Sequence, residues 1–128
     1  MATTESIEER LDLALAAELQ AALLPRQCPT DCPHQVMAAR NRMCSTLGGD
    51  FYDFLRLNDD QVAVLIGDVV GHGVRASLIM AQITGFLRSH TTRLSRPAVV
   101  AGLLNDLLLE LGRRTDSVTP CTLVYGVL

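Results

Sequence analysis

The sequence predicts one domain of the α+β class, in which helices pack on antiparallel strands. Its 128 residues suffice for one domain, and 48% hydrophobic with 20% charged residues is typical of a chain that buries a core. Two extended segments joined by a short polar turn indicate an antiparallel hairpin. Three further segments carry apolar residues at helical spacing. These features exclude a disordered or fibrous protein.

Charge and hydropathy exclude two classes of partner. The net charge is −3, and the 11 basic residues are all arginines, scattered along the chain, so no surface for nucleic acid or anionic lipid is indicated. The apolar runs are interrupted well before the ~18 residues that a membrane span needs, and the first residues show no signal-peptide pattern. We therefore expect a cytoplasmic protein that binds neither nucleic acid nor membrane.

The N-terminal segment predicts an amphipathic helix over residues 6–24. The capping box Ser6-Ile7-Glu8-Glu9 marks its start and Pro25 its end. Because the spacing of its apolar residues drifts around the helix instead of holding a heptad seam, we expect this stripe to pack on the rest of the domain. A homodimer formed through the helix is the alternative. The apolar stripe consists of Ile7, Leu11, Leu15, Leu19 and Leu23.

The next segment predicts a loop over residues 25–34 and a strand of mixed polarity over residues 35–43. It also holds a group of side chains that could bind zinc. Their spacing is not that of a standard zinc knuckle, and prolines interrupt the loop, so reduced thiols are favoured over a small zinc-binding module. The candidate zinc ligands are Cys28, Cys32, Cys44 and His34.

A hairpin follows. Residues 48–57 are aromatic and extended, residues 58–60 have turn composition, and residues 61–68 form a nearly all-apolar strand. A turn centred on this tripeptide places Asp50 directly opposite Asp68. Opposed carboxylates destabilise a strand pair unless a cation lies between them. The hairpin therefore predicts a site for a hard divalent cation such as Mg²⁺ or Mn²⁺.

Two helices and a last strand complete the domain. The loop Gly71-His72-Gly73 leads into a helix predicted over residues 74–90. A second helix is predicted over residues 97–112, with a proline in its first turn and a glycine at its end. Residues 119–128 predict a strand.

The loop after the second strand adds the features of an anion site. Gly49 and the glycines at 71 and 73 allow the backbone to approach a ligand, and the amides at a helix start suit a phosphate. An aspartate at a strand end can equally be a helix cap, and a Gly-x-Gly sequence a plain turn.

Three motifs, taken together, resemble one protein family. They are Leu23-Leu24-Pro25, Gly48-Gly49-Asp50-Phe51-Tyr52-Asp53, and Gly67-Asp68-Val69-Val70-Gly71-His72-Gly73 with Ala76 and Met80. Their order and spacing resemble the SpoIIE/RsbU branch of the metal-dependent (PPM, type 2C) protein serine/threonine phosphatases. The resemblance implies an α-β-β-α sandwich with antiparallel sheets, incomplete at the C-terminus, whose N-terminal portion is residues 26–128. Residues 1–25 would be a linker or regulatory helix that follows a sensor or receiver protein.

The resemblance also implies a function. Proteins of this branch use metal-activated water to remove phosphate from phosphoserine or phosphothreonine, typically on a STAS-type anti-anti-sigma protein in sigma-factor and stress signalling. Asp50 would ligate one metal of a two-metal Mn²⁺ or Mg²⁺ centre, Asp68 would bridge both metals, and Val69 would offer its backbone carbonyl. The loop around the phosphate would be formed by Gly49, Gly71, His72 and Gly73.

Three assignments stay open at this level. His72 is a candidate general acid, or a residue that caps the following helix. Asp53 lies on the opposite strand face from Asp50 and is expected to be structural. Because the two further metal-ligating aspartates of the family match no residue of this chain, the alternative function is a truncated, non-catalytic regulatory docking module of the same fold.

Overall fold

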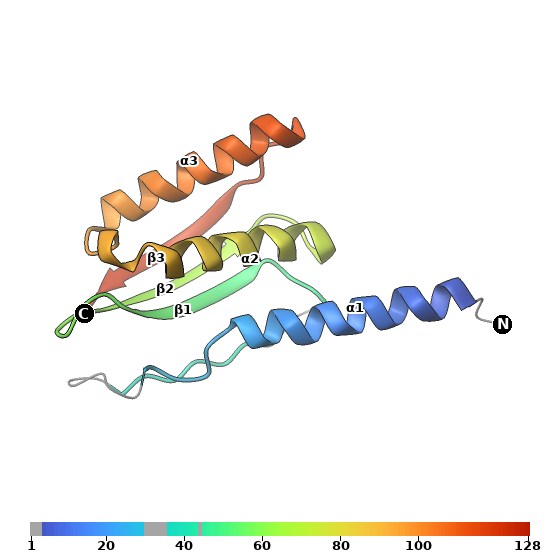
Figure 1. The fold of residues 1–128 in the computed structure, drawn as a ribbon, viewed down its shortest axis with the longest axis horizontal. Coiled ribbons are helices and arrows are strands. Elements are labelled where there is room, and N and C mark those ends of the chain that lie inside the picture. The colour runs from blue at the N-terminus through green and yellow to red at the C-terminus, as the bar shows by residue number, and fades with distance from the viewer. Residues whose placement is uncertain (1–3, 30–35, 44) are drawn as a thin grey trace.

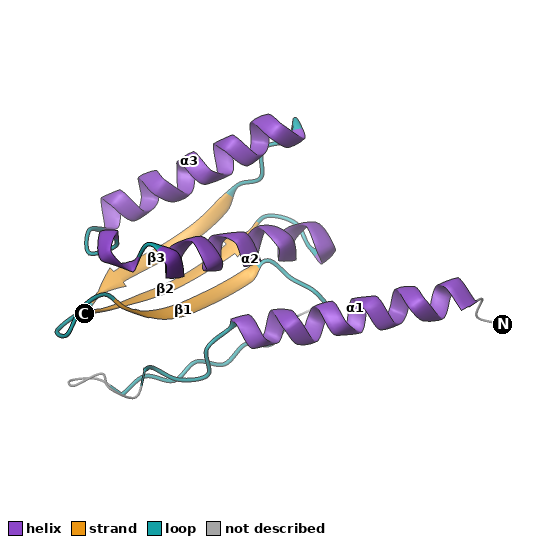
Figure 2. Cartoon of the chain, in the orientation of Figure 1, coloured by secondary structure: helices purple, strands orange, loops and turns teal. Residues whose placement is uncertain are grey.

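The computed structural model describes residues 4–29, 36–43 and 45–128. It contains helices on a three-stranded sheet, which is the predicted α+β class (Figures 1 and 2). Helices α2 and α3 lie on one side of the sheet, and α1 extends beyond it toward the N-terminus (Figure 1). The elements are α1 (Thr4–Leu23), β1 (Asp50–Arg56), β2 (Val62–Val69), α2 (Gly73–Ser89), the short 3₁₀ helix η1 (Thr91–Arg93), α3 (Pro97–Thr115) and β3 (Cys121–Val127).

The sheet has the order β1-β2-β3, and both strand pairs are antiparallel. The turn between β1 and β2 is closed by the Leu57 amide, which donates to the Gln61 carbonyl at 3.0 Å. Within the turn, the Asp60 amide donates to Oδ1 of Asn58 at 2.9 Å. This short loop sets the register and pairs Asp50 with Asp68, so the predicted hairpin is confirmed.

The core lies between the sheet and the two helices that cover it. Alternate strand residues point to this side, as the pleat of a strand requires. The largest fully buried side chains come from both layers. Because α2 and α3 bury one face against the sheet, their apolar residues recur at helical spacing in the sequence. The fully buried side chains include Phe51, Leu65, Met80, Ile83, Leu87 and Val100.

Helix α3 is one turn longer than predicted. We expected its end at Gly112, but it continues to Thr115 and stops where Asp116 adopts a left-handed conformation with φ 51°. Arg113 and Arg114 both donate to the Glu110 carboxylate, at 2.9 Å each. These pairs at spacings of three and four support the last turn of a helix.

The prediction that the α1 stripe packs on the domain is wrong for four of its five residues, and only Leu23 of the stripe packs against the core. Ile7, Leu11, Leu15 and Leu19 are 57%, 58%, 54% and 66% exposed. Only the last turn of the helix reaches the domain, through buried Gln20 and the following Leu24. The helix also includes Thr4, so Ser6 lies inside it and does not cap it.

The predicted strand over residues 35–43 does not form in its described part, residues 36–43. One bridge pairs Gln27 with Ala38, and the Cys28 amide donates to the Met37 carbonyl at 3.0 Å. A segment without regular alternation of polar and apolar residues has no face to bury, which explains why the pairing stops there. Cys28 is buried, whereas Cys32, His34 and Cys44 lie outside the described residues, so the zinc alternative stays untested.

The described helices do not meet the requirements for crossing a membrane. None of them is both long enough and apolar enough to span a bilayer.

Candidate functional site

The candidate site lies where β1 begins and β2 ends. Asp50 is the first residue of β1, and Asp68 stands opposite it near the end of β2. Both aspartates are exposed, and alternation places them on the sheet face that α2 and α3 leave open. On that face they adjoin Tyr52, Ile66 and Val124 in a shallow depression.

The two carboxylates repel each other. Partial loss of solvent raises the pKa of Asp50, and its hydrogen bond with Asp68 and the repulsion from that carboxylate raise it further. A hydrogen bond between carboxyl groups needs a shared proton, so protonation relieves the pair when nothing else does. A divalent cation between the same oxygens would relieve it without a proton.

Backbone groups come close to the pair because position 49 is a glycine. The Val69 amide donates to the Gly49 carbonyl at 3.0 Å. A Cβ atom on Gly49 would lie 2.5 Å from the Val69 carbonyl oxygen, closer than any real contact. This close approach places the Val69 carbonyl against Gly49, the residue before Asp50, so that carbonyl is a candidate third oxygen donor for a hard cation.

The donor set is small. Within residues 4–29, 36–43 and 45–128, no third Asp, Glu, His or Cys joins these two aspartates as a metal-binding group. The residues present therefore fit partial coordination of a divalent cation, with positions left over for water or for groups from elsewhere.

The loop that follows β2 turns sharply toward the start of α2. Gly71 and Gly73 have φ of +104° and +72°, values that side-chain-bearing residues rarely adopt. His72 between them is extended and exposed, and its side chain makes no capping hydrogen bond. His72 therefore occupies the N-cap position of α2 but does not cap through its side chain, and the first α2 amides are left for another acceptor.

Gln20 is a residue that the sequence analysis missed. Its side-chain Nε2 donates to the Gly48 carbonyl at 2.6 Å, and the Gly48 amide donates to its Oε1 at 3.2 Å. The amide side chain thus ties α1 to the segment directly before Asp50. Its spacing of four residues from the buried Leu24 is the one signal that indicated an inward position.

Asp53 is structural, as its strand face indicated. It is buried, and Nε of Arg88 donates to its Oδ2 at 2.7 Å. Arg88 also donates to the Leu23 carbonyl, and the Phe54 amide donates to Oδ1 of Asp53 at 2.9 Å. This ion pair joins β1, α2 and the end of α1 on the helix side of the sheet, away from Asp50.

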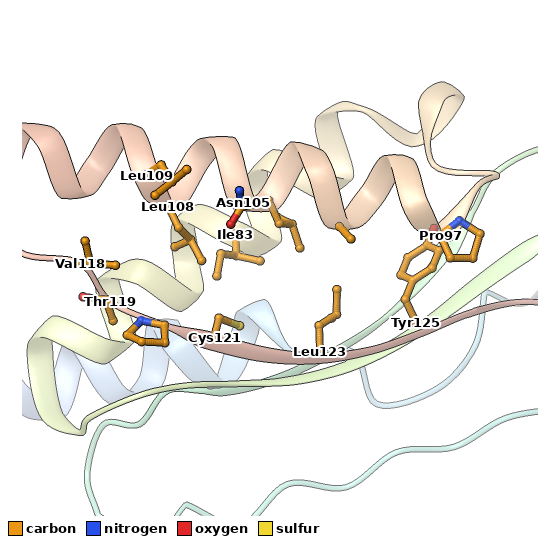
Figure 3. Close-up of a pocket in the computed structure, with 13 residues that line it drawn as sticks. Ile83, Pro97, Asn105, Leu108, Leu109, Val118, Thr119, Cys121, Leu123 and Tyr125 are labelled. Atoms are coloured by element: carbon orange, nitrogen blue, oxygen red, sulfur yellow. The ribbon is translucent and has the colours of Figure 1, made fainter.

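A cavity larger than the depression at the aspartates lies elsewhere. A space of about 620 Å³ between α3 and β3 is lined mainly by apolar side chains such as Leu108, Leu123 and Tyr125 (Figure 3). Leu123 and Tyr125 alternate with Thr122, the strand partner of Asp68, so this cavity opens on the opposite face of the sheet from the aspartates. It has no carboxylate and is not the candidate metal site.

Comparison with protein families identifies the chain. The family model described as "Stage II sporulation protein E (SpoIIE)" matches residues 58–128, which is more than half of the sequence. The chain belongs to the SpoIIE family. The match includes Asp68 and the Gly71–Gly73 loop, whereas Asp50 lies before it and is connected to it through the hairpin.

Two similar proteins place this SpoIIE-family chain among longer ones. It is 35% identical over 79 residues to Protein IcfG of Synechocystis sp., a match that covers 62% of this chain and 12% of that protein. Its structure is similar to that of the SiaA-PP2C domain of Pseudomonas aeruginosa, with a TM-score of 0.60 and 21% identity. That similarity covers 98% of this chain and 51% of the other, so the chain has the fold of part of a PP2C domain.

Proposed function

We propose that this chain is the part of a metal-dependent phosphatase that removes phosphate from phosphoserine or phosphothreonine on a regulatory protein. The observation that carries the proposal is the pairing of Asp50 with Asp68, two like charges held opposite each other at the end of the sheet. Membership of the SpoIIE family supports the same function.

The chemistry depends on a divalent cation, Mn²⁺ or Mg²⁺, which Asp50, Asp68 and the Val69 carbonyl would hold. When bound, such an ion activates water and offsets the negative charge of a phosphate. The two carboxylates have the geometry for this task because the hairpin fixes their positions across one strand pair. Because Gly49 has no side chain, the Val69 carbonyl can lie close to it and would be the third oxygen ligand.

The loop after β2 would orient the phosphate. The first amides of α2 have no partner inside the helix, and residues 73–76 include no acidic side chain. A phosphate oxygen is a suitable acceptor for such amides, since the helix dipole also favours negative charge there. His72, which is exposed between the two glycines, is placed to hold or transfer a proton at its imidazole ring.

The substrate in this proposal is a phosphorylated anti-anti-sigma protein of the STAS type. The support is the family description as a sporulation protein, together with the hydrogen bond of Gln20 in α1 to Gly48, in the segment before Asp50. A sensor or receiver protein that acts on α1 would then be the upstream partner.

One observation favours a second function. The described residues offer two carboxylates and one carbonyl, and cation affinity grows with the number and charge of the ligands. A docking module that binds the phosphoprotein without hydrolysing it needs no complete metal centre. The two functions differ in turnover alone, so hydrolysis decides between them.

The test is hydrolysis of a phosphoserine peptide by the full chain with and without Mn²⁺. We expect activity that requires Mn²⁺ and is abolished by Asp68→Asn. Asp60→Asn is the matched control, because it makes the same change in the exposed turn at the other end of the same hairpin. A folded chain that binds the peptide but releases no phosphate contradicts the phosphatase and supports the docking module.

A further inference from the structure

A second surface lies close to the candidate site. A groove of about 490 Å³ runs between the first half of α2 and the end of α3. Its apolar lining includes Val74 and Leu78, which are 54% and 65% exposed, and Leu111 on the α3 side. Exposed leucine and valine side chains that line one groove are typical of a surface that another molecule covers.

Arg75 lines this groove, and its guanidinium is held by neutral groups. One of its terminal nitrogens donates to Oγ of Ser117 at 2.8 Å and to Oγ1 of Thr119 at 3.0 Å. Among the described residues, no carboxylate lies within ion-pair distance of it, whereas Arg88, Arg113 and Arg114 all have acidic partners. Two neutral hydroxyls thus fix the guanidinium in place without neutralising it.

The groove begins near the loop that follows β2, at the same end of the sheet as the candidate site. Arg75 follows Gly73 by two residues on the first turn of α2. The loop that carries Ser117 and Thr119 is tied to the end of β2, where the Val70 amide donates to the Pro120 carbonyl at 3.0 Å. A protein chain whose phosphate lay at the start of α2 would therefore extend its neighbouring residues along this groove.

We propose that the groove binds the substrate segment that flanks the phosphoserine, and that it recognises an apolar side chain next to a carboxylate. The apolar side chain would pack between Leu78 and Leu111, and the carboxylate would pair with the guanidinium of Arg75. Planar guanidinium groups bind carboxylates through two parallel hydrogen bonds, which gives direction as well as charge. This proposal rests on the proposed function, because it takes a phosphoprotein as the partner.

The test uses fluorescent peptides that carry a non-hydrolysable phosphonate analogue of phosphoserine. One set places a Leu-Glu pair at different distances from the phosphonate, and the matched set places Ser-Lys at the same positions. Fluorescence anisotropy with the full chain and Mn²⁺ should show tighter binding of at least one Leu-Glu peptide. Arg75→Glu should weaken that binding by about tenfold, which is the effect of one charged hydrogen-bonded pair.

Two further variants keep the result interpretable. Leu78→Ser should weaken binding of the same peptide. It should leave the fold intact because the Leu78 side chain is mostly exposed. Arg93→Glu is the matched charge control, since Arg93 is exposed on η1 at the other end of α2. Equal binding of both peptide sets, or equal loss in Arg75→Glu and Arg93→Glu, overturns the proposal.

Failure of this proposal is distinguishable from failure of the proposed function. Hydrolysis of p-nitrophenyl phosphate, which has no flanking residues, reports on the phosphatase alone. Mn²⁺-dependent hydrolysis without any peptide preference contradicts the proposed role of the groove and is consistent with the proposed phosphatase activity. A clear preference without hydrolysis supports the groove and favours the docking module.

Discussion

The charge of Asp68 faces that of Asp50 across the strand pair and therefore destabilises the folded chain when no cation is bound. Replacing Asp68 with Asn keeps the shape and removes one of two facing charges, so we expect the free energy of unfolding without Mn²⁺ to rise by about 0.5–1 kcal/mol. If the proposed site binds Mn²⁺, the ion should stabilise the native chain, and that stabilisation should disappear in the same variant. Thermal unfolding with and without MnCl₂ measures both effects. A variant that keeps the full Mn²⁺ response would falsify the assignment of Asp68 as a ligand.

Asp50 gives the pair a pH dependence of known sign. Its pKa in the folded chain is raised above the ordinary 3.8, so the native state holds this proton more tightly than the unfolded state. The contribution of Asp50 to stability therefore falls as pH rises from about 3.8 through the raised value, and is recovered on acidification. Urea unfolding of wild type and Asp50→Asn across that range isolates the effect. Without Mn²⁺ the contribution of Asp50 should fall as pH rises, and with bound Mn²⁺ it should rise instead, because the cation competes with the proton for the carboxylate.

Single residues also show where sequence reasoning ends. The carboxylate pair was predictable because a three-residue turn fixes its register through local rules. Gln20 was not, since its partner Gly48 lies 28 positions away and helix periodicity alone cannot indicate which polar residue turns inward. The position of the Arg75 guanidinium was not predictable either, because the hydroxyls that hold it belong to residues more than 40 positions away.

At the scale of elements, α1 is attached to the domain mainly through its C-terminal end. Gln20→Leu should lower the free energy of unfolding by about 1–3 kcal/mol, because it leaves the amide and carbonyl of Gly48 without their partner. Glu18→Leu is the control on an exposed face of the same helix. Chemical unfolding followed by circular dichroism measures the difference, and equal stability of the two variants argues against the anchor.

The exposed part of α1 has a different consequence. Four large apolar side chains on one helix favour pairing with another apolar helix face, and a second copy of α1 is one. We expect concentration-dependent self-association that Leu11→Gln with Leu15→Gln weakens, while monomer stability changes by less than about 0.5 kcal/mol. Sedimentation velocity over a range of concentrations measures this. A chain that stays monomeric throughout contradicts pairing through α1.

Helices and strands were predictable to different degrees for a physical reason. α2 and α3 have continuous apolar faces that cover the sheet, so their periodicity reports their packing. Residues 36–43 have no such face, and β propensity without a partner strand does not make a sheet. The α1 stripe was misread because amphipathicity indicates that a face will be covered, not which molecule covers it.

At the scale of the whole molecule, the two sides of the sheet have separate tasks. The helix side holds the core and the Asp53–Arg88 ion pair, which together stabilise the fold. The open side holds the carboxylate pair beside exposed Ile66 and Val124. The α+β class could be predicted from the sequence because local patterns define each layer. The docking groove could not, because it lies between elements that meet only in the folded chain.

The hairpin that joins Asp50 to Asp68 also bears on when the site forms. The two aspartates lie 18 positions apart within one hairpin, whereas the Gln20–Gly48 and Arg88–Asp53 contacts span 28 and 35 positions. Hairpins form in about 1–10 μs, and longer loops close later because their closure costs more entropy. The carboxylate pair is therefore expected to form earlier in folding than these two contacts, and under the proposed function Mn²⁺ added during refolding would favour the native strand register before the helices dock.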